Sequence, residues 1–120
     1  MEAHVWLDGP AAVEGRVQGP ARSLFLEMNG IALRAEPRGE EIAPPAAYDR
    51  VATIGVPTLV VWGDLDFPHL CVRCEHLLAT IPGAMGAPMP GTAHLPSLEA
   101  PDAFDAVLMP FLHEVRASAV

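Results

Sequence analysis

The chain has 120 residues, about the commonest size of a single domain, and a net charge of −8. It has no cluster of basic residues and no apolar run long enough to cross a bilayer, so we expect neither nucleic-acid binding nor a membrane association. The first ten residues do not resemble a signal peptide, and two cysteines do not make a disulfide scaffold. We therefore expect a cytoplasmic protein.

The proportion of apolar residues is high for a chain of this size. Hydrophobic residues make up 51% of the sequence, although a small domain has much surface for its volume. This composition indicates that some apolar faces pack against a partner outside the chain.

The first half of the chain reads as helical segments joined by irregular stretches. Glycine and proline punctuate residues 1–19, and apolar residues then recur at helical spacing over residues 21–35. A polar linker containing Pro and Gly covers residues 36–45, and a short helix is predicted over residues 46–53.

The second half alternates between strands and helices. Residues 56–62 form a continuous apolar run rich in β-branched residues, which is typical of a strand buried on both faces. The elements predicted after it are a helix over residues 69–81, a short strand over residues 85–89 and a helix from about Pro101. This alternation predicts parallel strands covered by helices.

Two polar residues follow the two predicted strands. Asp66 comes shortly after the first strand, and His94 lies in the loop PGTAHLP after the second. Because functional groups gather at the carboxyl ends of parallel strands, we expect Asp66 and His94 at the same edge of the sheet.

The stretches VPTLVVWGDLD and IPGAMGAPMPGTAHLPSLEAPDAFDAVLMPFL carry family-like motifs. A buried strand ending in G-x-x-D, an I-P-G turn, a P-G-x-x-H loop and an L-E-x-P helix entry together resemble the C-terminal part of the α/β-hydrolase superfamily. The resemblance implies an α/β class with a partial α/β-hydrolase fold, in which the last two parallel strands carry covering helices after a helical cap-like segment. It divides the chain into a cap-like segment and linker over residues 1–50 and a core portion over residues 51–120.

The same resemblance implies catalytic roles. Asp66 matches the acid of a catalytic triad and His94 its base, with Asp64 as the competing acid. A triad carboxylate holds the imidazole in one tautomer and stabilises the imidazolium that forms when the histidine accepts a proton from the nucleophile.

The nucleophile of such a triad is missing from the sequence. The family places it in a G-x-S-x-G elbow, and none of the three serines, Ser23, Ser97 and Ser118, has that context. We therefore expect the C-terminal portion of a hydrolase for esters, lactones or similar bonds, inactive alone and acting on a small molecule when an N-terminal half completes it. Whether that half supplies Ser, Asp or Cys stays open.

A cluster of potential metal ligands, HLCVRCEH, invites a zinc interpretation. On a helix, however, Cys71 and Cys74 share one face, whereas His69 and His76 lie near the opposite side. We therefore expect no metal site, and no motif for a cofactor is present.

The alternative is a hydrolase remnant without catalytic activity. Its exposed sheet edge and apolar helix faces would then bind a partner chain or a second copy of the protein, as a homodimer.

Overall fold

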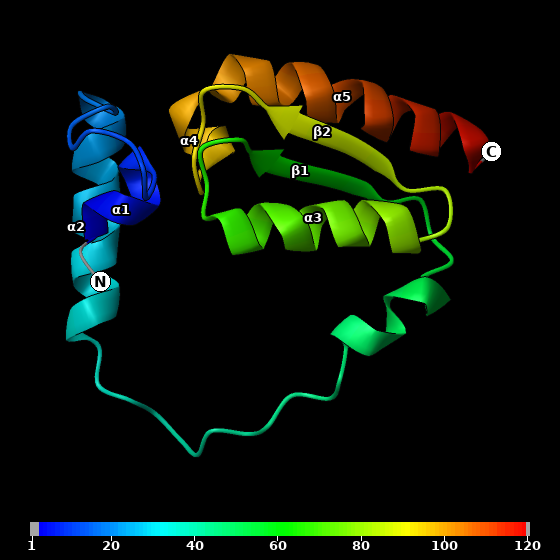
Figure 1. Cartoon of the computed structure of the whole chain (residues 1–120), viewed down its shortest axis with the longest axis horizontal. Coiled ribbons are helices and arrows are strands. Elements are labelled where there is room, and N and C mark those ends of the chain that lie inside the picture. The colour runs from blue at the N-terminus through cyan, green and yellow to red at the C-terminus, as the bar shows by residue number, and fades with distance from the viewer. Residues whose placement is uncertain (1–2, 120) are drawn as a thin grey trace.

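Helices and two strands alternate along residues 3–119, the part of the chain that the computed structural model describes (Figure 1). The elements in chain order are α1 (Ala3–Asp8), α2 (Pro20–Arg34), the 3-10 helix η1 (Tyr48–Thr53), β1 (Leu59–Gly63), α3 (Pro68–Thr80), β2 (Met85–Met89), α4 (Pro96–Glu99) and α5 (Pro101–Ser118).

The two strands form one parallel sheet. Leu59 pairs with Met85 at one end and Gly63 with Met89 at the other, so both strands end at the same edge. Helix α3 makes the crossover, and the strands lie between α3 and α5 (Figure 1). The sequence predictions of parallel strands and of a short strand over residues 85–89 are confirmed.

The expectation of a partial α/β-hydrolase fold is wrong. About half of the chain is helical, and residues 3–119 contain one sheet of only two strands. The loop motifs report the turns that follow individual strands, and they carry no information on how many strands pair side by side. Each strand here has a single neighbour, so the multi-stranded sheet of that fold is not formed.

Several element boundaries also differ from the sequence predictions. The first strand begins at Leu59 rather than at residue 56, after Pro57, a residue that cannot donate a backbone hydrogen bond to a ladder. The short helix predicted over residues 46–53 is a 3-10 helix at Tyr48–Thr53. Residues 1–19, which were expected to be irregular, contain α1. The helices at residues 21–35, 69–81 and from about Pro101 are confirmed within two residues.

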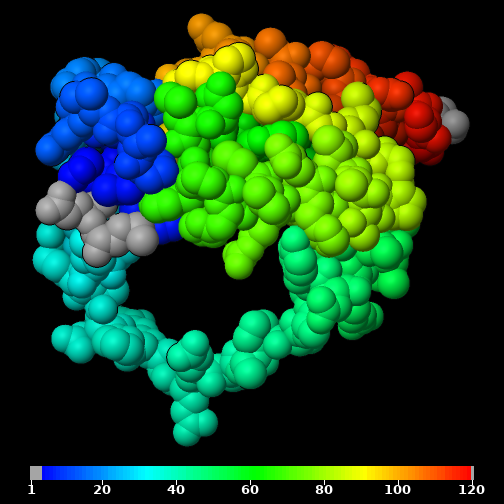
Figure 2. Space-filling model, viewed as in Figure 1, coloured from blue at the N-terminus to red at the C-terminus, as the bar shows by residue number. Residues whose placement is uncertain are grey.

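The chain exposes more surface than a compact protein of its mass. Its accessible surface is 8480 Å², whereas a folded monomer of 12.7 kDa exposes about 6,200 Å². No residue of α2 is buried, and every residue from 31 to 50 is exposed. Figure 2 shows residues 35–47 passing around an open space that separates them from α3.

Candidate acid–histidine site

Two loops meet at the carboxyl edge of the sheet. The acid loop (residues 64–67) follows β1, and the His loop (residues 90–95) follows β2. The structure brings Asp66 and His94 together, with 2.9 Å between Asp66 Oδ2 and His94 Nδ1. The Asp66 side chain is 9% exposed and that of His94 is 39% exposed, so the carboxylate is sheltered while the imidazole reaches solvent.

Hydrogen bonds fix both the acid loop and the carboxylate of Asp66. The Leu65 N–H donates to the Thr92 carbonyl over 2.9 Å, and the Phe67 N–H donates to Asp66 Oδ1 over 2.7 Å. Both oxygens of Asp66 therefore have a partner. Asp64, the competing acid, instead accepts the Gly91 N–H on Oδ1 over 2.8 Å, which ties the two loops together.

Aromatic side chains lie against His94. The indole of Trp6 meets the imidazole edge to face, with the ring centroids 4.5 Å apart, and Phe67 lies 4.7 Å from Trp6. The backbone N–H of His94 also donates to the backbone carbonyl of Trp6 over 3.4 Å. This contact could not be predicted from the sequence, because nothing in the local pattern around residue 6 connects it with residue 94.

A salt bridge that no sequence pattern indicates connects the N-terminal segment (residues 3–34) with α4, directly after the His loop. Arg16 pairs with Glu99, and it also donates to the carbonyls of Leu7, Asp8 and Gly91. The L-E-x-P motif contains Glu99, but its partner is 83 positions away in the chain, so only the fold reveals the pair.

A second buried carboxylate organises the N-terminal segment itself. The Asp8 side chain is fully buried, and it accepts the N–H groups of Gly15 and Val17 and both bonds of an ion pair with Arg22. Burial raises the pKa of Asp8, but these hydrogen bonds and the charge of Arg22 outweigh burial and hold the pKa below its usual value. The carboxylate is therefore ionised and locks the turn after α1.

The residues that could act as nucleophiles are not activated. Ser23 and Ser118 lie inside helices and donate to the carbonyls of Gly19 and Glu114, over 3.4 and 2.9 Å. Ser97 lies in the single turn of α4. Burial, with the negative charge of Asp66 added, raises the pKa of the Cys71 thiol, so this cysteine is not a thiolate at neutral pH.

Three of the four His and Cys residues of the zinc-like cluster have separate contacts. The Cys71 thiol faces the Gly63 carbonyl over 3.6 Å, His69 packs on Phe67, and His76 stacks on Tyr48. Among residues 3–119, no three His, Cys, Asp or Glu side chains are placed to share a metal ion.

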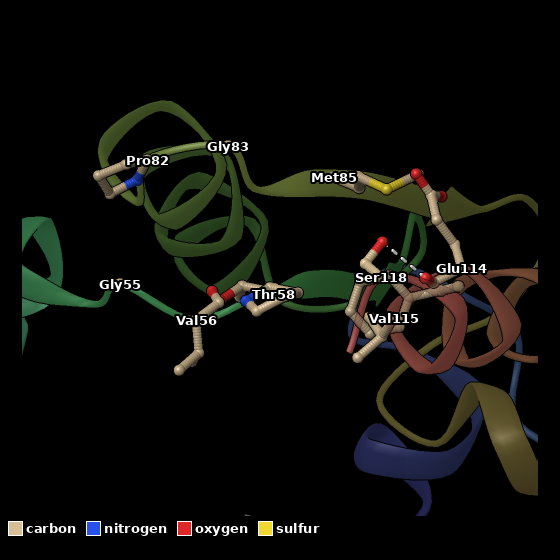
Figure 3. A pocket seen from close by; sticks show the side chains of 11 residues that line it. Gly55, Val56, Thr58, Pro82, Gly83, Met85, Glu114, Val115 and Ser118 are labelled. Carbon is tan, nitrogen blue, oxygen red and sulfur yellow. Dashed lines mark hydrogen bonds between the residues drawn. The ribbon is translucent and has the colours of Figure 1, made fainter. Parts of the chain in front are cut away.

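Two pockets flank the sheet at opposite ends. The one beside the acid loop has a volume of about 230 Å³ and is lined by Pro10, Ala11, Ala12, Asp64, Leu65, Asp66 and Pro68. The other, of about 360 Å³, lies at the amino ends of the strands next to α5 (Figure 3). Its walls include Val56, Met85, Glu114 and Val115, and it is at the far end of the strands from His94.

The arrangement at the carboxyl edge is suited to proton transfer. A sheltered carboxylate that accepts from Nδ1 fixes the tautomer in which Nε2 carries the free lone pair.

None of the helices within residues 3–119 is both long and apolar enough to cross a membrane. Comparison with protein-family models, with curated proteins and with solved structures finds no match to the chain.

Proposed function

We propose that Asp66 and His94 are the acid and the base of a hydrolytic triad that cleaves an ester, a lactone or a similar bond of a small molecule. The observation that carries this proposal is the 2.9 Å contact between Asp66 Oδ2 and His94 Nδ1 at the carboxyl edge of a parallel sheet. The resemblance of the two loops to those of α/β hydrolases supports the same roles, although the chain does not form that fold.

In this proposal, Asp66 and His94 have distinct roles. Asp66 holds the Nδ1 proton, so His94 Nε2 is free to accept the proton of an attacking hydroxyl and later to return it to the leaving group. The pocket beside Asp66 offers mostly apolar walls to a small substrate.

The nucleophile has to come from a separate polypeptide segment, because the sequence contains no G-x-S-x-G elbow. The isolated chain is therefore expected to hydrolyse p-nitrophenyl acetate no faster than free imidazole at equal concentration. Activity should appear when the chain is co-expressed with, or fused to, a polypeptide that carries such an elbow, and the reading frame next to its own gene is the first to test.

In that completed protein, His94→Ala should lower kcat by about a thousandfold or more, because triad members act as a unit. His76→Ala is the matched control, since His76 lies on α3 and stacks on Tyr48 instead of Asp66. Equal activity of the His94→Ala variant and the parent would refute the assignment, as would a failure of every elbow-bearing partner to give activity.

A second function, as an interaction module, is favoured by the surface of α2. This helix has no buried residue, and its apolar side chains are largely exposed, namely Leu24, Leu26, Met28, Ile31 and Leu33. Leu24, Met28 and Ile31 recur at helical spacing and so share one side of α2. An exposed apolar stripe of this kind favours a protein-binding face.

Self-association through α2 is tested by light scattering coupled to size-exclusion chromatography. The parent chain should behave as a dimer or larger species, and the double substitution Met28→Lys with Ile31→Lys should make it monomeric. Val72→Lys, which changes an equally exposed apolar residue on α3, should leave the mass unchanged. A monomeric parent chain contradicts this second function.

A further inference from the structure

We propose that Glu99 is a positioning residue for His94 and that Arg16 completes the positioning by docking the N-terminal segment on the same loop. The inference rests on the proposed function only in giving His94 a catalytic role. The juxtaposition itself is a buried carboxylate that binds the backbone on both sides of the candidate base.

Glu99 holds the peptide groups that flank His94. Its carboxylate accepts the Ala93 N–H over 3.0 Å on each oxygen and the Leu95 N–H over 3.3 Å on Oε1. These bonds restrict the backbone immediately before and after His94, and so fix the direction in which its side chain leaves the loop. The Asp66 contact then needs only one side-chain rotamer.

The turn of α4 explains how Glu99 reaches back. Pro96 begins the helix, and the Glu99 N–H donates to the Leu95 carbonyl over 3.0 Å. The chain thus makes one turn after His94 and returns a carboxylate to the loop that it has just left. Pro at the first helical position favours this start, because its fixed φ matches the helix.

The burial of Glu99 requires a positive partner. Its side chain is 2% exposed, and an ionised carboxylate out of water is costly unless it is paired and hydrogen-bonded. Arg16 provides the charge, while its remaining N–H groups bind carbonyls of Leu7, Asp8 and Gly91. One guanidinium therefore joins Glu99, the His loop and the segment that carries Trp6.

This docking has a direct effect at the imidazole. It places the Trp6 ring edge to face against the His94 ring, and it directs the backbone carbonyl of Trp6 to the backbone N–H of His94. The ring of His94 is then bounded by Trp6 and by Asp66, and the charge pair that fixes both contacts lies outside the reacting atoms.

The test is the 15N NMR spectrum of the His94 imidazole, recorded on the full chain labelled with 15N at histidine. In the parent protein, the Nδ1–H tautomer should dominate. The Asp66→Asn variant should lose this preference, and its spectrum serves as the reference for a His94 without the carboxylate. Glu99→Gln removes the charge and presents an amide N–H to the Ala93 N–H, so the Nε2–H tautomer of His94 should rise about twofold or more. Glu27→Gln, an exposed Glu→Gln change on α2, is the matched control and should leave the spectrum unchanged.

Glu99→Asp keeps the charge but is one methylene too short to reach both N–H groups, and it serves if Glu99→Gln does not fold. A folded Glu99 variant with the parent's His94 signals would refute the positioning role, because a merely structural Glu99 would change the melting temperature alone. In Arg16→Lys, which retains only the pairing charge, the Trp6 ring-current shift on His94 should decrease, and an unchanged shift refutes the role of Arg16. None of these readouts involves hydrolysis, so they stand or fall separately from the triad proposal.

Discussion

Replacing Gly63 with alanine should separate the two loops of the site. Gly63 is the last residue of β1, and a Cβ built on it would overlap the carbonyl oxygens of Thr92 and Ala93 and lie 2.6 Å from the Thr92 carbonyl carbon. All three atoms belong to the backbone of the His loop. No side-chain rotation can therefore relieve the overlap, and the loop has to move.

The expected loss of stability follows from these contacts. Overpacking a fitted site costs about 1–3 kcal/mol, and losing the bond from Leu65 to the Thr92 carbonyl adds about 1 kcal/mol. We expect Gly63→Ala to lower the free energy of unfolding by about 3 kcal/mol. For a domain of this size, that corresponds to a decrease in Tm on the order of 10 °C.

Urea unfolding followed by circular dichroism measures this change. Gly55→Ala is the matched control, because a Cβ there meets nothing within 4 Å. It should be neutral or stabilise the fold by up to about 1 kcal/mol through the unfolded state. A Gly63→Ala protein within about 0.5 kcal/mol of the parent would refute the close approach described here.

Three other measurements test the ionisable and aromatic contacts. Because the pKa of Asp8 is depressed, its contribution to stability is fully present above the unfolded value of about 3.9 and is lost as the pH falls through the lower folded value. Asp8→Asn should cost about 3 kcal/mol at neutral pH and flatten that acid dependence, and an unchanged dependence of stability on pH below the unfolded value contradicts it. Burial raises the pKa of the Cys71 and Cys74 thiols, so iodoacetamide should label them about tenfold more slowly in the native protein than in urea, and equal rates would refute the burial. Tyr48 stacks on His76 at 4.7 Å, so Tyr48→Ala should cost about 1 kcal/mol in urea unfolding while Tyr48→Phe costs little, and equal stability of the two variants argues against the stack.

The local elements of this structure could be predicted from the sequence. The strand over residues 85–89, the helix that follows the acid loop and the final helix all come from strong periodicity or clear stop signals. The expectation that Asp66 and His94 share an edge needed only the parallel order of two strands, and the structure places them 2.9 Å apart.

The sequence could not predict the contacts between distant segments. Nothing near Arg16 indicates that it binds Glu99, and nothing near Trp6 indicates that it covers an imidazole. The expectation of a partial α/β-hydrolase fold was wrong for a related reason. The motifs lie in loops, and each one is satisfied by the single strand that it follows, so they do not establish the fold to which that strand belongs.

The linker over residues 35–47 has a consequence for how firmly the N-terminal segment is held. A short tether keeps its two ends at an effective concentration of about 1 mM. If the two parts were separate chains at micromolar concentration, an interaction with a Kd of about 0.1 mM would leave them almost entirely dissociated. Through the tether, the same interaction keeps the N-terminal segment bound about nine-tenths of the time. A single backbone cut in this exposed stretch would turn an intramolecular contact into a dissociable peptide, and Trp6 would leave His94 with it.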